Sequence, residues 1–378
     1  MQKKILILGA LPPPYTGQSI SLDKLVETLK TDNDFIVNNI NLAPKTNHTT
    51  GSLNYSRIYE TINVIIKYLL KLIFFKPDVI YITKGSSKWG FIRDYIFEKL
   101  RSIFCQKAKF VVHLKGGNYD KFYEQSSCEL KKRIRHFLIK SDKIIVLGPS
   151  LIKMYDFCPE VQNKIFVVYN ALPHQVVNSK VVKDNKQLQI LFLSNLILSK
   201  GYFDILRSIV LLKDYNIHFH FAGEFMLSPD DEYKNNSVAD LREMFFSFIK
   251  NEGVSDKITY HGVLVNGDKY SLLEKTDIFI LPTYYHVEGQ PISIIEAMAC
   301  SNAIISTDYR SIPDIVDENS NCIFVEPKNP GSIVAAIKIF YNDREKLKHF
   351  QNASYERYLD FHTWDNHYKS MATIFKEV

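Results

Sequence analysis

A helix-like stretch, Glu288-Gly-Gln-Pro-Ile-Ser-Ile-Ile-Glu296-Ala-Met-Ala-Cys300, follows the strand-like run Asp277-Ile-Phe-Ile-Leu281 after one short polar loop. Pro291 stands near the first turn of the predicted helix, where a missing backbone N–H costs least. The free N–H groups of that turn, with the partial positive charge of the helix end, predict an anion site.

Glu296 lies in this predicted helix among Ile294, Ile295, Ala297 and Met298. A carboxylate in such an apolar run is costly to bury without a partner, and a ligand hydroxyl is a suitable partner. A strand end, a helix N-terminus and a carboxylate one turn deeper therefore indicate a nucleotide-sugar site. A second interpretation stays open, in which Glu296 reaches solvent at the helix edge and the Glu288 carboxylate is an ordinary loop charge.

The composition indicates a folded protein of two domains. The chain has 378 residues and a hydrophobic fraction of 46%, which excludes a disordered protein. Its five cysteines are scattered and include no Cys-x-x-Cys pair, which argues against a disulfide framework and a zinc site and favours a reducing compartment. The first apolar run is too short for a signal peptide, so we expect a cytoplasmic protein.

The net charge of +6 is unevenly distributed along the chain. Residues 1–172 carry 26 Lys and Arg and 14 Asp and Glu, a net charge of +12, whereas the remainder carries 21 basic and 27 acidic residues, a net charge of −6. We expect no nucleic-acid partner, because no zinc-finger, RNP-type or helix-turn-helix pattern is present. An anionic membrane surface or a phosphorylated acceptor fits the basic half better.

Short apolar runs alternate with helical stretches through the first half, and several runs are continuous and β-branched, as in a parallel sheet covered on both faces. The predicted strands are 5–8, 35–40, 79–83, 110–113, 144–147 and 165–168. The predicted helices lie near 18–30, 54–75, 88–104, 120–140 and 149–156. This alternation predicts a doubly wound α/β domain over residues 1–172.

The pattern is lost over the polar residues 173–187, which we interpret as a linker, and restarts in a second α/β domain over residues 188–355. Its predicted strands are 190–193, 218–221, 258–260, 278–281, 303–306 and 323–325, and its helices lie near 201–213, 238–251, 268–275, 290–300 and 331–341. We expect residues 356–378 to form a helix that returns to the first domain. Two such domains leave a cleft lined by the carboxyl ends of both sets of strands, and clefts of this kind bind ligands.

Three further residues follow predicted strands and are candidates for ligand contact. Gly17 precedes a helix and would let the backbone approach a phosphate or sugar, with an ordinary Pro/Gly turn as the alternative. Lys200 ends a strand-to-helix loop and would neutralise a diphosphate, with a solvated lysine as the alternative. His113 would hydrogen-bond a sugar hydroxyl or steer a proton, with a histidine packed at a strand end as the alternative.

Basic, aromatic helices near 54–75, 88–104 and 121–140 are candidates for contact with a membrane surface, with a solvated face as the alternative. We expect no transmembrane segment, because the longest apolar run contains Lys67 and Lys71 and is shorter than the ~20 residues that a span requires. The chain also has no Gly-x-Ser-x-Gly elbow, no Gly-x-x-x-x-Gly-Lys-Ser/Thr loop and no His-Glu-x-x-His pair, which argues against the enzyme classes that these motifs mark.

Taken together, these motifs resemble the glycosyltransferases of family 4, which are retaining enzymes of the GT-B fold, over nearly the whole chain. The most specific element is Glu288-x7-Glu296 with Gly289, Pro291 and the Ile-Glu-Ala-Met-Ala run. The other elements stand in the family's order and are the Pro-rich loop to Gly17, His113 with Gly116 and Gly117, Lys200-Gly201, Gly223, Gly262 and Ile312-Pro-Asp-Ile-Val316.

The resemblance implies two Rossmann-like doubly wound domains facing a central cleft, with a UDP- or GDP-sugar donor in the second and the acceptor in the first. It implies catalytic roles for Glu288, His113 and Lys200. Donor binding is expected at Gly17, Asn195, Lys200, Glu288, Gly289, Gln290, Pro291, Ile292 and Glu296. Within this set, the resemblance assigns the nucleotide ribose to Glu296, the donor sugar to Glu288 and the diphosphate to Lys200.

The sequence departs from the family pattern at four places. Ser194-Asn195 stands where the family has Gly-Arg, so the diphosphate meets an uncharged amide there. His113-Leu-Lys115-Gly116 replaces His-x-His-Gly, Arg310-Ser311 replaces Gly-Gly, and Asn170-Ala171 replaces Asn-Gly. These departures leave the subfamily and the donor open, along with the sugar, the acceptor, the linkage and the oligomeric state.

The implied reaction transfers a sugar, with retention, to a hydroxyl of a glycan or a polyprenyl-diphosphate-linked glycan. Cleft closure excludes water, and Lys200 and the helix N-terminus stabilise the departing diphosphate, so no cofactor and no metal are expected. The basic first domain predicts a peripheral position at the inner face of the plasma membrane, in O-antigen or capsule synthesis. The alternatives are a nucleotide-sugar 2-epimerase of the same fold and a non-catalytic two-domain ligand-binding protein.

Overall fold

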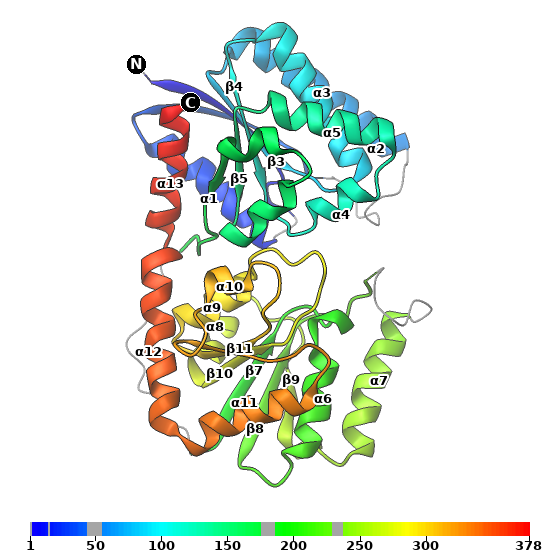
Figure 1. Ribbon diagram of the computed structural model, residues 1–378, viewed down its shortest axis with the longest axis vertical. Helices are drawn as coiled ribbons and strands as arrows, with labels where there is room; N and C mark the ends of the chain where they lie inside the picture. The colour runs from blue at the N-terminus through cyan, green and yellow to red at the C-terminus, as the bar shows by residue number, and fades with distance from the viewer. Residues whose placement is uncertain (1, 14–15, 44–54, 175–185, 229–236) are drawn as a thin grey trace. The chain divides into compact units, whose positions relative to one another are not determined.

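The computed structural model describes residues 2–13, 16–43, 55–174, 186–228 and 237–378. These residues form two compact units (Figure 1). The first unit consists of Met1–Pro173 and Trp364–Val378, and the second of His174–Thr363. Each unit is built on a six-stranded sheet in which all neighbouring strands are parallel. The predicted pair of doubly wound α/β sheets is therefore confirmed.

The first sheet has the strand order β2-β1-β3-β4-β5-β6. Its strands are β1 (Lys3–Gly9), β2 (Phe35–Asn41), β3 (Val79–Lys84), β4 (Lys109–Leu114), β5 (Lys143–Val146) and β6 (Ile165–Val167). All six strands predicted for the first half are present, because each apolar run is long enough to cross the sheet and is bounded by polar residues. The order reverses between β1 and β3, so the carboxyl ends of these two strands form a topological switch point.

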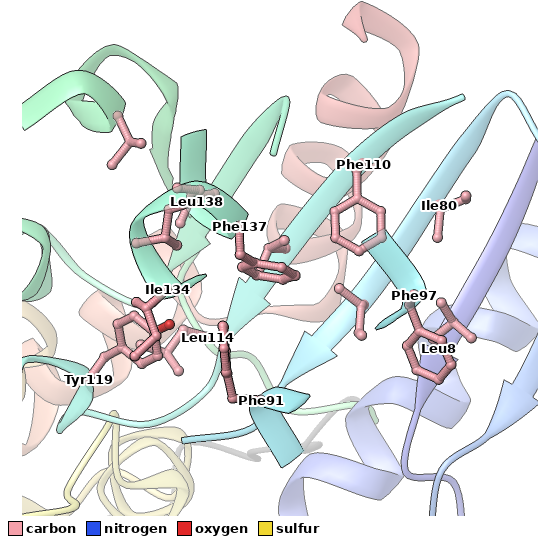
Figure 2. Close-up of a cluster of buried hydrophobic side chains, with 14 of the residues drawn as sticks. Leu8, Ile80, Phe91, Phe97, Phe110, Leu114, Tyr119, Ile134, Phe137 and Leu138 are labelled. Carbon is pink, nitrogen blue, oxygen red and sulfur yellow. The ribbon is translucent and has the colours of Figure 1, made fainter. Parts of the chain in front are cut away.

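Helices cover both faces of the first sheet. They are α1 (Gly17–Thr31), α2 (Tyr55–Leu70), α3 (Lys88–Phe104), α4 (Tyr119–Glu124), α5 (Cys128–Lys140) and α13 (Trp364–Glu377). On one face, Ile80 and Phe110 of the strands pack with Phe97 of α3 and Phe137 of α5, as Figure 2 shows. This aromatic core follows from the alternation of side chains along β3 and β4, which sends every second residue to this face.

The other face of the first sheet is covered by α1 and α13. The rings of Tyr81 on β3 and Phe375 on α13 meet edge to face, with centroids 5.6 Å apart. Lys3 of β1 donates hydrogen bonds from its Nζ atom to the carbonyl oxygens of Phe375 (3.2 Å), Lys376 (2.6 Å) and Val378 (2.7 Å). A cation at the carboxyl end of a helix is stabilising, so Lys3 fixes the end of α13 on the sheet.

The second sheet has the strand order β12-β11-β10-β7-β8-β9. Its strands are β7 (Leu188–Leu193), β8 (Ile217–Ala222), β9 (Ile258–Tyr260), β10 (Ile278–Leu281), β11 (Ala303–Ser306) and β12 (Cys322–Phe324), and its helices are α6 (Tyr202–Leu211), α7 (Val238–Asn251), α8 (Asn266–Lys275), α9 (Ile292–Ala299), α10 (Ile312–Ile315), α11 (Pro330–Asn342) and α12 (Arg344–Phe361). All six strands predicted for the second half are present. The order reverses between β7 and β10, and ligands of open α/β sheets bind beyond the carboxyl ends of strands at such a point.

Two predicted helices of the first unit differ from the structure. The segment 120–140 forms two helices, α4 and α5, because the Ser127 hydroxyl accepts a hydrogen bond from the N–H of Leu130 and starts α5 anew. The segment 149–156 is a 3₁₀-helix, η2 (Pro149–Tyr155), followed by a second, η3 (Pro159–Lys164). Helix α2 starts at Tyr55 and continues as a π-helix over Lys71–Phe75, so the predicted end at residue 75 agrees.

The division between the units lies close to the predicted boundaries, with one difference. The first unit ends at Pro173, and residues 175–185 of the predicted linker lie outside the described residues. At the carboxyl end the predicted break at residue 356 is wrong, because α12 continues to Phe361 in the second unit. Its buried residues Leu347, Phe350 and Tyr358 hold it there, where it packs on α9 and β11. The first unit resumes at Trp364.

Within the described ranges, none of the helices is both long enough and apolar enough to cross a membrane.

Candidate active site

The loop after β7 carries Lys200 to the carboxyl edge of the second sheet. Ile197 leads into a single 3₁₀ turn, Leu198–Lys200, and Gly201 follows with a left-handed backbone (φ +80°). A Cβ atom at Gly201 would lie 2.4 Å from the carbonyl oxygen of Pro282. Only glycine fits this close approach, which brings the loop after β7 against the loop after β10.

Lys200 and Glu288 form an ion pair at this edge, with 2.8 Å between Nζ and Oε2. Their side chains are only 12% and 8% exposed. The Thr283 hydroxyl donates to the same carboxylate oxygen at 3.3 Å, and the Lys200 amine lies 5.2 Å from the centre of the Tyr285 ring. The predicted pair of catalytic charges is thus held together in a nearly dry environment, where charge interactions are strong.

Hydrogen bonds to and from its backbone fix the loop that carries Glu288. The N–H of Tyr284 donates to the carbonyl oxygen of Ser199 at 2.8 Å, which ties this loop to the one that carries Lys200. The Thr307 hydroxyl donates to the carbonyl oxygen of Thr283 at 2.5 Å, and the Ser311 hydroxyl donates to that of Gly289 at 2.6 Å. The loop is therefore positioned by the ends of three strands of the same sheet.

The carboxylate of Glu296 is buried in α9. The sequence analysis expected its burial to be costly without a partner. Its Oε1 atom accepts from the Lys269 amine at 2.5 Å and from the Tyr270 hydroxyl at 3.3 Å, both on α8. The Tyr270 hydroxyl is also within 2.9 Å of Nε2 of His174. Lys269 and Tyr270 thus supply the partners that the sequence analysis assigned to a ligand hydroxyl.

The residues between the two carboxylates form the start of α9. Pro291 is the N-cap and makes no side-chain capping bond, so the first turn has no cap from its own side chain. Gly289, Gln290 and Pro291 are buried, and Ile292, the first residue of α9, is half-buried. An eight-residue helix with this N-terminus next to Lys200 is suited to bind a phosphate. Asn195, on the loop after β7, is exposed.

His113 and Gly17 belong to the first unit. His113 is the fifth residue of β4 and is 0% exposed. Its Nδ1 atom lies 2.8 Å from the Tyr81 hydroxyl, and burial, with Lys115 and His367 nearby, holds the pKa of its imidazole well below the usual value. This geometry fits a packed histidine at a strand end, and a catalytic role stays a prediction. Gly17 is exposed and is the first residue of α1.

Asp32 and Asp34 have an Asp-x-Asp spacing, which is frequent in metal sites that hold a diphosphate. They precede β2 at the amino edge of the first sheet, away from the strand ends where ligands bind. Asp32 accepts from the Tyr368 hydroxyl, and Asp34 pairs with Lys376 on α13. Both carboxylates therefore hold the C-terminal helix. In the described ranges no group of three or more metal-ligating side chains is found.

The local motifs missed five residues of this network: Thr283, Ser311, Lys269, Tyr270 and His174. Thr283 and Ser311 are small hydroxyl residues in loops, which no spacing rule distinguishes from ordinary turn residues. Lys269 and Tyr270 lie one turn inside a helix 27 and 26 residues before Glu296. One signal was available, because a buried carboxylate implies a cation close to it.

Residues 176–357 match the sequence model of the glycosyl transferases group 1 family. All the residues of the network around Lys200, Glu288 and Glu296 except His174 lie inside this segment. The matched segment lies within the second unit and contains the buried carboxylates of Glu288 and Glu296.

Curated relatives with related sequences are named as glycosyltransferases. An uncharacterised glycosyltransferase of Methanocaldococcus jannaschii is 26% identical over 230 residues, which cover 57% of this chain and 54% of the relative. The N,N'-diacetylbacillosaminyl-diphospho-undecaprenol α-1,3-N-acetylgalactosaminyltransferase of Campylobacter jejuni is 24% identical over 277 residues, which cover 70% of this chain and 65% of that enzyme. The alignments thus span between half and two thirds of the length of these relatives.

Solved structures show the fold. A glycosyltransferase of Rickettsia africae superposes with a TM-score of 0.72 at 16% identity, over 100% of this chain and 98% of that one. The Anabaena protein HepE, solved in complex with UDP, superposes with a TM-score of 0.75 at 12% identity, over 99% and 100% of the two chains. The GT-B fold that the resemblance implied is confirmed.

Proposed function

We propose that this protein is a retaining glycosyltransferase of family 4 that transfers a sugar from a UDP- or GDP-sugar to a hydroxyl of a glycan or lipid-linked glycan. The observation that carries the proposal is the buried Lys200–Glu288 ion pair at the switch point of the second sheet, beside the N-terminus of α9. A cation, a helix N-terminus and a carboxylate at one point match a diphosphate joined to a sugar.

Each charged residue has a distinct role in this proposal. Lys200 and the first turn of α9 bind the diphosphate and stabilise the charge that develops as it departs. Glu288 is then released from Lys200 and accepts hydrogen bonds from hydroxyls of the donor sugar. Glu296 accepts hydrogen bonds from the ribose, with Lys269 and Tyr270 orienting its carboxylate. Lysine suits this exchange because its ammonium is a single charge on a flexible stem.

The proposed stereochemistry is retention. A double displacement requires a carboxylate nucleophile and a separate acid or base, as in retaining glycosidases. The two buried carboxylates of the candidate site, Glu288 and Glu296, already have binding roles here. The acceptor hydroxyl therefore attacks on the face that the diphosphate leaves, and a diphosphate oxygen takes its proton. This route needs no metal and no cofactor.

The proposed acceptor is a lipid-linked glycan in O-antigen or capsule synthesis, reached from the cytoplasmic face of the membrane. The name of the Campylobacter relative denotes a substrate linked to diphospho-undecaprenol, and this chain is similar to it over 70% of its length. The Anabaena neighbour was also solved with UDP and glucose. These names support a sugar nucleotide and a lipid-linked acceptor without defining either sugar.

The exposed apolar side chains of helix α2 support the proposal that a membrane surface is a partner. Its residues Ile58, Ile62, Ile66 and Leu70 recur every four positions and are 46–52% exposed, and Phe74 of the following π-helix is 79% exposed. We call these five residues the α2 stripe. Exposed lysines at positions 67 and 76 flank it. An apolar stripe edged by lysines is typical of a helix that lies in the surface of an anionic membrane.

The experiment that tests the proposed function measures donor binding and donor hydrolysis together. Purified protein is titrated by calorimetry with a panel of UDP- and GDP-sugars, and release of UDP or GDP without acceptor is followed. The variants are Glu296→Gln, which keeps the shape of the side chain, and Glu252→Ala as a control at the exposed end of α7. We expect one donor to bind and to be hydrolysed slowly, with both signals lost in Glu296→Gln alone.

Two outcomes would overturn the proposal. If no sugar nucleotide binds, or if Glu296→Gln binds the donor as the wild type does, the donor site is not at Glu296. Conversion of the donor into its 2-epimer without release of UDP or GDP would favour the epimerase alternative. The anomeric configuration of the first product, measured by NMR, tests retention separately.

A further inference from the structure

Lys84, the last residue of β3, is buried in the first unit with its amine turned away from solvent. Its side chain is 6% exposed, and its Nζ atom has no hydrogen-bond partner within the described part of the chain. The amine lies 2.8 Å from the centre of the Tyr119 ring and 6.0 Å from that of Tyr155. Burial holds the pKa of Lys84 well below its usual value.

Three other polar atoms of the first unit are also buried and have no hydrogen-bond partner among the described residues. The hydroxyls of Tyr119 and Tyr155 and the side-chain oxygen of Asn118 are buried and, among the described residues, have no hydrogen-bond partner. Tyr119 and Tyr155 are 0% exposed, and their ring centres lie 5.5 Å apart. Figure 2 shows Tyr119 at one end of the aromatic core, beside Ile134. We call these four side chains the Lys84 cluster.

The nearest opposite charge does not satisfy Lys84. Asp94 on α3 is 0% exposed, but its carboxylate is bound by the guanidinium of Arg93 at 2.8 and 3.0 Å and by the N–H of Gly85 at 3.2 Å. Asp94 therefore attracts the ammonium of Lys84 without accepting a hydrogen bond from it. The amine of Lys84 thus has a carboxylate nearby but no hydrogen-bond partner among the described residues.

Buried polar atoms without partners are rare in folded proteins, since each costs the free energy of its lost hydration. The four atoms of the Lys84 cluster are contributed by β3, α4, η2 and the loop before α4. They lie at the carboxyl edge of the first sheet, because Lys84 ends β3 and Asn118 follows β4. Ligands of open α/β sheets bind at this edge.

The donor and acceptor capacities of the cluster define the ligand. Lys84 donates, the oxygen of Asn118 accepts, and each tyrosine hydroxyl does both. A phosphate diester only accepts, so it would leave the oxygen of Asn118 without a partner. Adjacent hydroxyls of a sugar ring donate and accept together, and they match all four atoms.

We propose that Lys84, Asn118, Tyr119 and Tyr155 form a subsite of the first unit that binds the hydroxyls of a sugar ring of the acceptor. The subsite rests on the proposed function, because an acceptor sugar is its ligand. It adds to that function a set of residues distinct from the carboxylates and lysines of the second unit.

The test uses a matched pair of tyrosine variants. Tyr119→Phe removes a hydroxyl that has no partner among the described residues, whereas Tyr68→Phe removes one that is equally buried but donates to the carbonyl oxygen of Phe97 at 3.1 Å. We expect Tyr119→Phe to keep or raise the Tm, because no hydrogen bond is lost, and Tyr68→Phe to lower it. Lys84→Met, which keeps the apolar stem, should also keep or raise the Tm.

The binding probes are the octyl glycosides of glucose, galactose, N-acetylglucosamine and N-acetylgalactosamine, titrated at millimolar concentration by ligand-observed NMR. We expect at least one to bind the wild type and Tyr68→Phe alike and to bind Tyr119→Phe and Lys84→Met about tenfold more weakly, as loss of one good hydrogen bond implies. Donor hydrolysis should be the same in all four proteins.

Three results would overturn the subsite. They are binding of none of the four glycosides, equal affinity of Tyr119→Phe and the wild type, and a fall in Tm for Tyr119→Phe as large as that for Tyr68→Phe, which would mean that the hydroxyl bonds to buried water. Failure of the proposed function gives a different signature, since the wild type would then hydrolyse no sugar nucleotide whatever the glycosides do.

Discussion

Lys200 and Glu288 are 88 residues apart in the chain and form a 2.8 Å ion pair at the point where the loops after β7 and β10 meet. A second lysine, Lys269, pairs in the same way with Glu296. Both Glu288 and Glu296 are thus held by a lysine of the second unit. In the proposed function the diphosphate takes Lys200 from Glu288, so that proposal makes binding of the donor and release of Glu288 one event.

The first prediction concerns this ion pair. Lys200→Met should lower the free energy of unfolding by about 2–4 kcal/mol, because it leaves the Glu288 carboxylate buried without a counter-ion. The double variant Lys200→Met/Glu288→Gln should recover most of that loss. Urea denaturation of both variants measures the difference. If Lys200→Met alone were as stable as the wild type, solvent would already screen the Lys200–Glu288 pair.

The same substitution should affect the reaction. Donor hydrolysis by Lys200→Met should fall by a factor of about 100 or more, as expected when one group that stabilises a departing charge is lost. Lys213→Met, at an exposed lysine after α6, is the control. If Lys200→Met hydrolysed the donor at the wild-type rate, the proposed catalytic role of Lys200 would be wrong.

A second prediction concerns Tyr270, whose hydroxyl lies between Glu296 and His174. Tyr270→Phe should bind the donor about three- to tenfold more weakly, because Glu296 loses one of the two contacts that orient it. Calorimetry with the donor measures the change. Tyr215→Phe, before β8 at the amino edge of the sheet, should bind as the wild type does. Equal affinities of the two variants would contradict the role of Tyr270.

Gly201 permits a third prediction, with Gly253 as a matched control. Both have left-handed backbones, with φ of +80° and +64°, but a Cβ would meet Pro282 only at Gly201 and has nothing within 4 Å at Gly253. Gly253→Ala should cost about 1–2 kcal/mol of stability from backbone strain alone. Gly201→Ala should cost at least about 3 kcal/mol, because overpacking adds to that strain. Similar losses would show that the two loops separate easily.

A fourth prediction concerns pH and the histidines of β8. Burial, with His218 and His261 nearby, lowers the pKa of His220 to about 4. Its Nδ1 atom lies 3.0 Å from Nε2 of His261, and its Nε2 atom lies 2.9 Å from the side-chain oxygen of Gln189. The unfolded chain binds a proton near pH 6.5, above the folded pKa, so this contribution is full above that pH and is lost as the pH falls from about 6.5 to 4.

Urea denaturation at pH 7.5 and pH 5 measures the effect. The wild type should lose about 1 kcal/mol through His220 at the lower pH, a figure reduced because the ring is partly exposed. His220→Gln should lose less over the same interval. An equal loss in both proteins would assign the pH dependence to other groups, of which the buried His367, with a pKa lowered to about 3, is the first to test.

The fifth prediction concerns the α2 stripe. The double variant Ile62→Ser/Ile66→Ser should bind vesicles that contain phosphatidylglycerol at least tenfold more weakly than the wild type, because it removes two apolar side chains from the membrane-facing side of the helix. Leu211→Ser, at a similarly exposed leucine of α6, is the control. Co-sedimentation with anionic and neutral vesicles measures binding. If the wild type did not bind anionic vesicles, the proposal of a membrane partner would be wrong.

The strands could be predicted because each of them coincides with an apolar run in its own short stretch of sequence. All twelve apolar runs form strands, and most are buried on both faces, as the runs of β10 and β11 show. The split of 120–140 into α4 and α5 was missed, because Ser127 is a capping residue inside an otherwise helical pattern. The end of α12 was also missed, since it depends on packing against α9 and β11, which has no local signal.

The candidate site was only partly predictable, for a related reason. Lys200 and Glu288 were found because each follows a strand at the switch point, but their direct contact depends on the close approach at Gly201. Lys269, Tyr270 and His174 reach Glu296 through the packing of α8 on α9, which no spacing in the sequence describes. The sequence therefore located the carboxylates and not the side chains that hold them.

The return of α13 to the first unit has a consequence for the order in which the protein folds. Met371, Ile374 and Phe375 complete the core beneath β1 and β3, and they are made after the whole second unit, His174–Thr363. During synthesis the second unit can fold as one uninterrupted segment, whereas the part of the first sheet that α13 covers stays exposed until the residues of α13 have been made. The first unit, although most of its residues are made first, is thus the later of the two to complete its core.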